Sequence, residues 1–234
     1  MPTTVGSRKE VSQMRKKITV AIMALVAVAA IPSVASATEV LDEAGNPFPL
    51  HTTRLKTEAN TTLELQSSSG PVKCDTTKFE GVLTENGPNI KADIDLAEFK
   101  EHSGTPRCAG PGGTWMEVLT DNMPWCLVST STTAWTLDGG TCGAAVRPNV
   151  EFTFDVWTAT SGGSTLTRCR YSLKGTTAHV VGTVNNGVAP ATLTFGADTT
   201  FERTEGSALF CPAGGTLIGT LQLRDHAGNG LKVT

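Results

Sequence analysis

The sequence predicts an all-β protein, built as an antiparallel β-sandwich or a closed β-barrel and stapled by disulfides. Polar and apolar residues alternate through many short segments, which Gly, Asn and Asp residues separate. This pattern is typical of antiparallel sheets with one face in water. Six cysteines stand in a chain of 234 residues, and an even number of cysteines in an exported protein indicates a disulfide framework. Alternation alone does not distinguish a sandwich from a barrel.

The alternation is clearest in residues 90–96 and 150–156. In both segments the even-numbered positions are apolar and the odd-numbered positions are polar or charged, so we expect each to present one face to a core. Threonine, which favours strands, is abundant. The expected strands are Thr52–Leu55, Thr62–Gln66, Phe79–Thr84, Ile90–Phe99, Thr114–Leu119, Trp125–Ser129, Ala134–Leu137, Val150–Thr158, Leu166–Leu173, Ala178–Val184, Ala191–Phe195, Thr200–Arg203, Thr216–Leu223 and Leu231–Val233.

Residues 1–37 have the composition of a secretory signal peptide. Three consecutive basic residues, 15–17, precede an apolar run at 18–30, and the small residues Ala35-Ser36-Ala37 follow. We expect cleavage after Ala37. The apolar run has 13 residues, fewer than the roughly 20 that span a bilayer as a helix.

The mature chain, residues 38–234, is expected to form a single all-β domain, with residues 38–46 as a loose leader. The signal could start at Met1 or at Met14. No second long apolar run follows it, so we expect no membrane span after cleavage and a secreted, extracellular monomer. The short Ala-x-Ala ending of the signal indicates a bacterial protein.

The charge of the mature chain argues against a nucleic-acid partner. The whole chain has 19 basic and 22 acidic residues, and the signal removes five basic and one acidic residue, which leaves 14 and 21 and a net charge of −7. A protein that binds nucleic acid needs basic residues that displace phosphate counterions. Moderate negative charge instead keeps an exported protein soluble.

All six cysteines follow the expected cleavage point. Six cysteines allow 15 pairings. We expect one pair to close a loop of hairpin size, a bridge that the chain-entropy model values at about 3 kcal/mol. That pair is Cys126–Cys142, and the other expected pairs are Cys169–Cys211 and Cys74–Cys108.

Residue spacing gives no indication of a metal ion or an organic cofactor. The sequence contains no Cys-x-x-Cys, so a zinc site is not expected. The glycine-rich segment Gly110–Gly113 lacks the spacing of a dinucleotide or phosphate loop. The four histidines are scattered rather than grouped at ligand spacing: His51, His102, His179 and His226.

Two pairs of carboxylates share a strand face, Asp93 with Asp95 and, more widely spaced, Glu151 with Asp155. Alternate residues of a strand lie roughly 6.5–7 Å apart, near the separation used by inverting glycosidases. A solvated strand face explains the same pattern, and we prefer that interpretation. The sequence also lacks the Gly-x-Ser-x-Gly nucleophile motif. We therefore assign no catalytic residue.

Four tryptophans lie near the middle of the chain, and we expect at least three of them in the core. Trp125 stands beside Cys126 and is expected to pack on a disulfide. Trp157 falls on the polar register of its strand, so its ring is expected to point outward. We identify Trp157 as the candidate binding residue, because an outward tryptophan marks a contact surface.

These features favour an exported, non-enzymatic binding or cell-envelope-associated protein. Its partner would be a protein, a glycan or a small apolar ligand. One alternative is a carrier of a small apolar ligand, which requires a cavity lined by Phe152, Phe154 or Val180. The other is a hydrolase, which requires His179 or His226 to meet a serine or a carboxylate.

Four short motifs of the mature chain are similar to motifs of other proteins. They are Val72-Lys73-Cys74, Met123-Pro124-Trp125, Cys169-Arg170-Tyr171 and Ala208–Pro212. With them the chain resembles a group of uncharacterised secreted proteins from actinobacteria, and the resemblance covers most of the mature chain. The motifs are structural, and the group offers no activity that could be carried over to a residue of this chain. Residues 225–230 are also similar to the neocarzinostatin-type carriers, which are secreted β-sandwiches, but six residues at one turn are too few to imply a ligand.

Overall fold

The computed structural model describes most of the chain after the expected signal. The described residues form strands joined by turns and one short 3-10 helix, η1 (Pro111–Gly113), so the predicted all-β class is confirmed. Within this part of the chain, no helix is long and apolar enough to cross a membrane. The expected signal lies outside the described residues, which are 39–59, 61–100, 107–129, 131, 133–157, 167–173, 180–185, 187–196, 199–209 and 211–234.

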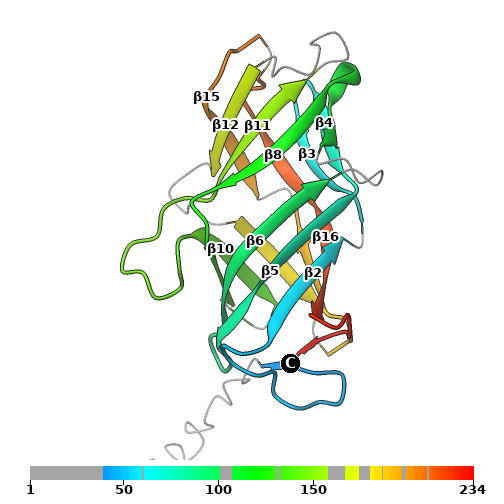
Figure 1. Ribbon diagram of the computed structural model, residues 1–234, viewed down its shortest axis with the longest axis vertical. Helices are drawn as coiled ribbons and strands as arrows, with labels where there is room; N and C mark the ends of the chain where they lie inside the picture. The colour runs from blue at the N-terminus through cyan, green and yellow to red at the C-terminus, as the bar shows by residue number, and fades with distance from the viewer. Residues whose placement is uncertain are drawn as a thin grey trace, which may run out of the picture. The chain divides into compact units, whose positions relative to one another are not determined.

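Strand pairing closes two antiparallel rings of eight strands each (Figure 1). Closure identifies barrels rather than a sandwich, because a closed ring leaves no strand edge. Around the first ring run β2 (Arg54–Ala59), β5 (Thr76–Glu85), β6 (Lys91–Lys100), β9 (Trp125–Ser129), β10 (Ala134–Gly139), β13 (Val180–Asn185), β14 (Thr192–Phe195) and β16 (Gly214–Asp225). Around the second run β3 (Leu63–Ser67), β4 (Gly70–Cys74), β7 (Cys108–Ala109), β8 (Trp115–Asp121), β11 (Glu151–Trp157), β12 (Thr167–Leu173), β15 (Thr200–Glu205) and again β16.

Strand β16 belongs to both rings. Its first part pairs with β15 and β3, where Leu217 lies opposite Leu65. Its second part pairs with β2 and β14, where Leu221 lies opposite Ala59 on one side and Leu193 on the other. Figure 1 shows β16 passing from the ring with β8 and β11 to the ring with β5 and β6. One continuous strand therefore joins the two barrels.

The change of partners along β16 occurs at Gly219. This residue is buried and has a φ of 153°, in the region that side-chain-bearing residues avoid. A Cβ atom placed on it would lie 2.7 Å from Leu63 Cδ1 and 3.1 Å from Leu63 Cα. Glycine is therefore the residue that lets β16 turn from one barrel into the other while β3 stays in contact.

A cluster of aromatic rings connects the cores of the two barrels. Phe152 on β11 contacts Phe99, Trp125 and Phe201, and Phe79 contacts Phe99 and Trp125. All five ring pairs meet edge to face with centroids 5.1–6.0 Å apart, a geometry that adds to the burial energy of the rings. Since Phe79, Phe99 and Trp125 come from the first ring and Phe152 and Phe201 from the second, the barrels share this part of the core.

The apolar face expected at 150–156 is confirmed, because Val150, Phe152, Phe154 and Val156 are all buried. The solvated opposite face is not, because Thr153 and Asp155 are buried as well. The alternation expected at 90–96 fails at its end. In β6, Leu96 pairs with Glu80 and Ile94 with Gly81, so Asp95 is an extra residue in a β-bulge. A bulge reverses the direction of the residues that follow it, which leaves Leu96 only half-buried.

The first described residues are not the loose leader expected at 38–46. Val40 is fully buried and lies in β1 (Val40–Leu41), which pairs with β17 (Lys232–Val233). The Asn86 side chain donates to the carbonyl oxygen of Val40 and accepts from its N–H. Burial of an apolar side chain and paired backbone groups explain why this segment is ordered against the first barrel.

Three disulfides join the six cysteines in the pairs expected from the sequence. Cys74–Cys108 links β4 to β7 in the second ring. Cys169–Cys211 ties β12 to the segment before β16, and Cys126–Cys142 ties β9 to the segment after β10. Each bridge therefore fastens a short strand or a connecting segment to a barrel wall.

Candidate functional site

The candidate contact surface lies on the outer face of β8 and β11 in the second barrel. Antiparallel pairing sets Trp115 opposite Trp157 and Leu119 opposite Thr153. Residues that lie opposite each other on neighbouring strands point to the same face, and this face is the outer one because the alternate residues of β11 fill the barrel. Trp115 is 37% exposed and Leu119 39% exposed. The two strands therefore present large apolar side chains to the outside.

The ring of Trp157 is partly covered by Arg107. The guanidinium carbon of Arg107 lies 4.3 Å from the centre of the Trp157 ring, within the range of a cation–π interaction. The buried indole Nε1 of Trp157 has no hydrogen-bond partner within the described part of the chain. Trp157 is half-buried, so Trp115 is the more open of the two rings. We call Trp115, Leu119, Trp157 and Arg107 the tryptophan face.

The expectation that at least three tryptophans occupy the core is wrong. Trp125 and Trp135 are buried, whereas Trp115 and Trp157 belong to the tryptophan face. Parity along β11 identified Trp157 from the sequence. Trp115 was not identified, because its place opposite Trp157 depends on pairing between strands that are distant in the sequence.

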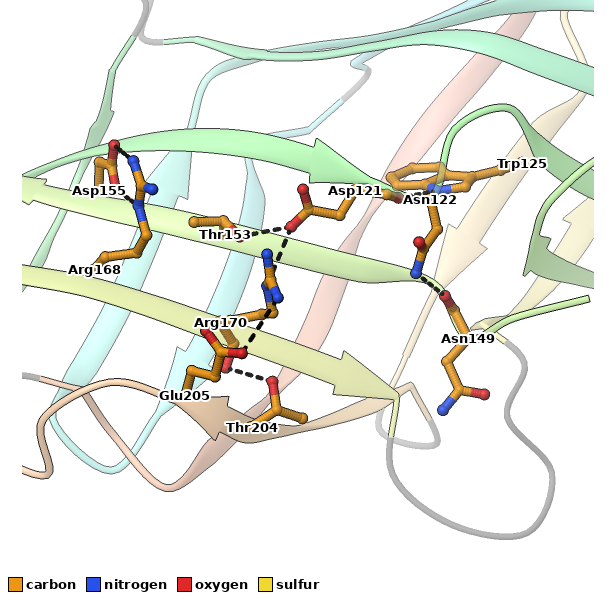
Figure 2. A network of polar contacts seen from close by, with 10 residues as sticks. All are labelled: Asp121, Asn122, Trp125, Asn149, Thr153, Asp155, Arg168, Arg170, Thr204 and Glu205. Atoms are coloured by element: carbon orange, nitrogen blue, oxygen red, sulfur yellow. Dashed lines mark hydrogen bonds and ion pairs between the residues drawn. The ribbon is translucent and has the colours of Figure 1, made fainter.

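The charged side chains beside the tryptophan face pair with one another (Figure 2). Arg168 donates to both carboxylate oxygens of Asp155, at 2.7 and 2.8 Å. Arg170 lies between Asp121 and Glu205, at 3.6 and 3.3 Å. Thr153 Oγ1 donates to Asp121 Oδ2 at 2.6 Å. Most of these groups have a polar partner within the cluster, although the buried Nε of Arg170 has no hydrogen-bond partner among the described residues. The face therefore offers mainly apolar contact.

The carboxylates Asp93 and Asp95 both have structural partners. Asp93 Oδ1 accepts from the N–H of Cys142 at 2.7 Å, and Asp95 Oδ2 accepts from Arg54 Nη1 at 3.0 Å. The hydrogen bonds from Arg54 hold the pKa of the Asp95 carboxyl below its ordinary value. A general acid of a glycosidase needs a raised pKa, so the environment of Asp95 favours a structural role.

The adjacent residues Asp225 and His226 belong to the turn after β16. The Asp225 carboxylate accepts from the backbone N–H and the side-chain amide of Asn229, both at 2.8 Å. These hydrogen bonds close the turn and leave His226 exposed. His179, the other histidine considered for a hydrolase, lies outside the described residues.

Asp93, Cys126 and Cys142 form a group whose potential ligand atoms lie within 4.8 Å of one another. The two sulfurs are bonded to each other, and the Asp93 carboxylate accepts the hydrogen bond of Cys142. A disulfide has no thiolate to offer a metal ion. The three residues therefore lie together because the disulfide and the hydrogen bond to Asp93 connect them.

A small apolar cavity lies inside the second barrel. Its volume is about 20 Å³, enough for a single water molecule. Its lining includes Leu63, Leu65, Phe152, Phe154, Tyr171 and Phe201. Phe152 and Phe154 were expected to line a carrier cavity, but a small apolar ligand would have to displace several of these side chains. The side chain of Val180 lies outside the described residues.

Tyr171, the sole tyrosine of the chain, provides a pH-dependent test of this core. Burial raises the pKa of Tyr171 to about 12, while an unfolded tyrosine ionises near pH 10. The phenol thus contributes stability that is complete below pH 10 and falls as the pH rises through 12, by about 3 kcal/mol in total. Absorbance at 295 nm should show phenolate forming near pH 12 or on unfolding. A step near pH 10 in the folded protein would contradict the buried position, and Tyr171→Phe should remove the signal.

Comparison of the chain with protein-family models, with curated proteins and with solved structures gave no match.

Proposed function

We propose that the mature chain is an exported, non-enzymatic binding protein, and that the tryptophan face is its contact surface. The observation that carries this proposal is the open ring of Trp115 beside Leu119 and the arginine-covered Trp157. Tryptophan and arginine supply a disproportionate share of binding energy in protein interfaces. A soluble protein gains nothing in folding energy from leaving such side chains on its surface.

Export is supported by two independent features. Residues 1–37 have a signal-like composition of the bacterial type, and three disulfides are typical of proteins that work outside the cytoplasm. With its signal removed, the chain would act as an extracellular or envelope-associated monomer. We assign it no catalytic residue and no cofactor.

The partner that best fits this face is another protein. A glycan site needs unpaired hydrogen-bonding groups around its stacking rings, whereas the nearby carboxylates of Asp121 and Asp155 are engaged with Arg170, Thr153 and Arg168. Aromatic and apolar side chains with an arginine beside them, surrounded by charged pairs, match the centre and rim of a protein interface. A glycan partner is an outcome that the experiment must distinguish.

Site-specific photo-cross-linking tests the proposal. A photoreactive amino acid is placed at Leu119 or, as a matched control, at Ile218, which is 41% exposed on β16. Ile218 lies on the opposite side of the second ring, because β16 and β8 are separated by three strands in either direction. The labelled protein is then incubated with the envelope and medium fractions of the producing cells.

We expect a discrete cross-linked protein from position 119 that is absent from position 218. Trp115→Ala should weaken binding of that protein about 30-fold, the effect of an interface hot spot worth about 2 kcal/mol. If glycosidases digest the cross-linked product, the partner is a glycan and not a protein. Equal cross-linking from the two positions, or none, would remove the tryptophan face as the contact surface.

A further inference from the structure

The disulfide Cys126–Cys142 differs from the other two in its exposure. All six half-cystines lie in the described part of the chain, and five of them are at most 5% exposed. Cys142 is the exception, since it is half-buried in the segment after β10. An external thiol can attack a disulfide only at a sulfur that it can reach, so Cys142 is the best place for such an attack.

The buried sulfur of this disulfide has a cationic neighbour. Arg147 Nη1 lies 3.1 Å from Cys126 Sγ and 2.9 Å from the buried carboxylate of Asp138. A guanidinium beside a sulfur stabilises its thiolate form. Thiol–disulfide exchange is faster when the sulfur that leaves is a stable thiolate, so Arg147 makes Cys126 the favourable leaving group.

The half-buried Cys142 also has a partner for its reduced form. Cys142 Sγ lies 3.5 Å from the carbonyl oxygen of Ala92, which a thiol at this position could use as a hydrogen-bond acceptor. The backbone N–H of Cys142 donates to Asp93, and the N–H of Gly139 donates to the carbonyl oxygen of Pro148. These contacts would hold the segment in place after the S–S bond is broken.

We propose that Cys126–Cys142 is a thiol-exchange site that accepts two electrons from external thiols. The thiolate of a small thiol attacks Cys142 Sγ, which forms a mixed disulfide and releases Cys126 as a thiolate beside Arg147. A second external thiolate attacks the sulfur of the first, which releases Cys142 and yields the oxidised external disulfide. Two external thiols are oxidised to one disulfide, and the protein gains two thiols while its other two bridges stay closed.

The test uses the purified protein in buffers of reduced and oxidised glutathione, without denaturant. Free thiols are trapped with iodoacetamide and assigned by peptide mass spectrometry. We expect Cys126 and Cys142 to be alkylated together, at a glutathione ratio at which the other four cysteines remain bridged. Reduction of another bridge first, or of all three at once, would overturn the proposal.

Two variants that break the same ion pair separate electrostatics from loosening. Arg147→Met removes the positive charge beside Cys126 and should lower the equilibrium constant for reduction about tenfold, which corresponds to about 30 mV. Asp138→Asn removes the negative charge and leaves Arg147, so it should raise that constant at least threefold. If loss of the ion pair merely loosened the segment, both variants would be reduced more easily, and the assigned role of Arg147 would be wrong.

Discussion

Replacement of Phe152 by alanine is expected to lower the free energy of unfolding by about 5 kcal/mol. Truncation of a buried phenylalanine costs about 3–5 kcal/mol through lost burial and the cavity that remains. Phe152 also loses edge-to-face contacts with Phe99, Trp125 and Phe201, each worth about 0.5–1.5 kcal/mol. The effect therefore lies at the upper end of the range. Denaturant unfolding followed by tryptophan fluorescence measures it.

The control for this variant is Ile218→Ala. Ile218 is a large apolar residue on the outside of β16, and such surface substitutions usually change stability by less than about 0.5 kcal/mol. Phe152→Leu should fall between the two, because it keeps most of the buried area but loses the ring contacts. A cost below about 2 kcal/mol for Phe152→Ala would show that the two barrels do not depend on a common aromatic cluster.

Gly219→Ala is expected to lower the free energy of unfolding by about 3–5 kcal/mol, through two separate causes. A side-chain-bearing residue is strained at the φ of Gly219, which costs about 1–3 kcal/mol. The added Cβ would also lie 2.7 Å from Leu63 Cδ1 and 3.1 Å from Leu63 Cα. The Leu63 side chain can rotate away from the added Cβ, but the contact with Leu63 Cα requires β3 and β16 to separate by a few tenths of an ångström. Thermal and denaturant unfolding give the size of the loss.

Gly228 offers a matched comparison because it has only the first cause. Its φ is 98°, and a Cβ atom on it would meet nothing within 4 Å. Gly228→Ala should therefore cost about 1–2 kcal/mol, the conformational penalty alone. Equal losses for the two variants would mean that Gly219 is not pressed against β3.

The strands could be predicted from local patterns, but their closure into rings could not. Each of the fourteen expected strands has a counterpart in the structure, because alternation and turn residues are properties of neighbouring positions. β1, β4 and β7 were not predicted, since their short sequences show little alternation. The bulge at Asp95 was not visible either, because it requires Gly81 on the partner strand, where a Cβ would lie 2.1 Å from the Asp93 oxygen.

The candidate surface was predicted only in part, for a related reason. The outward position of Trp157 follows from the alternation of its own strand. Trp115 lies beside it because β8 pairs with β11, and Arg107 lies over its ring because of the path of the segment before β7. The pair Cys126–Cys142 was predicted from its spacing in the chain, and the other two pairs were expected without such an argument. The proximity of Arg147 to Cys126, on which the exchange site depends, comes from the path of the segment after β10.

The most direct test of the architecture is the set of nuclear Overhauser contacts that β16 makes in solution. We predict cross-strand contacts from Leu217 to Leu65 in the second barrel, and from Leu221 to both Ala59 and Leu193 in the first. All should appear in one spectrum of the oxidised protein. If β16 showed contacts to the strands of one barrel and none to the other, the fold of two closed barrels on a common strand would be contradicted.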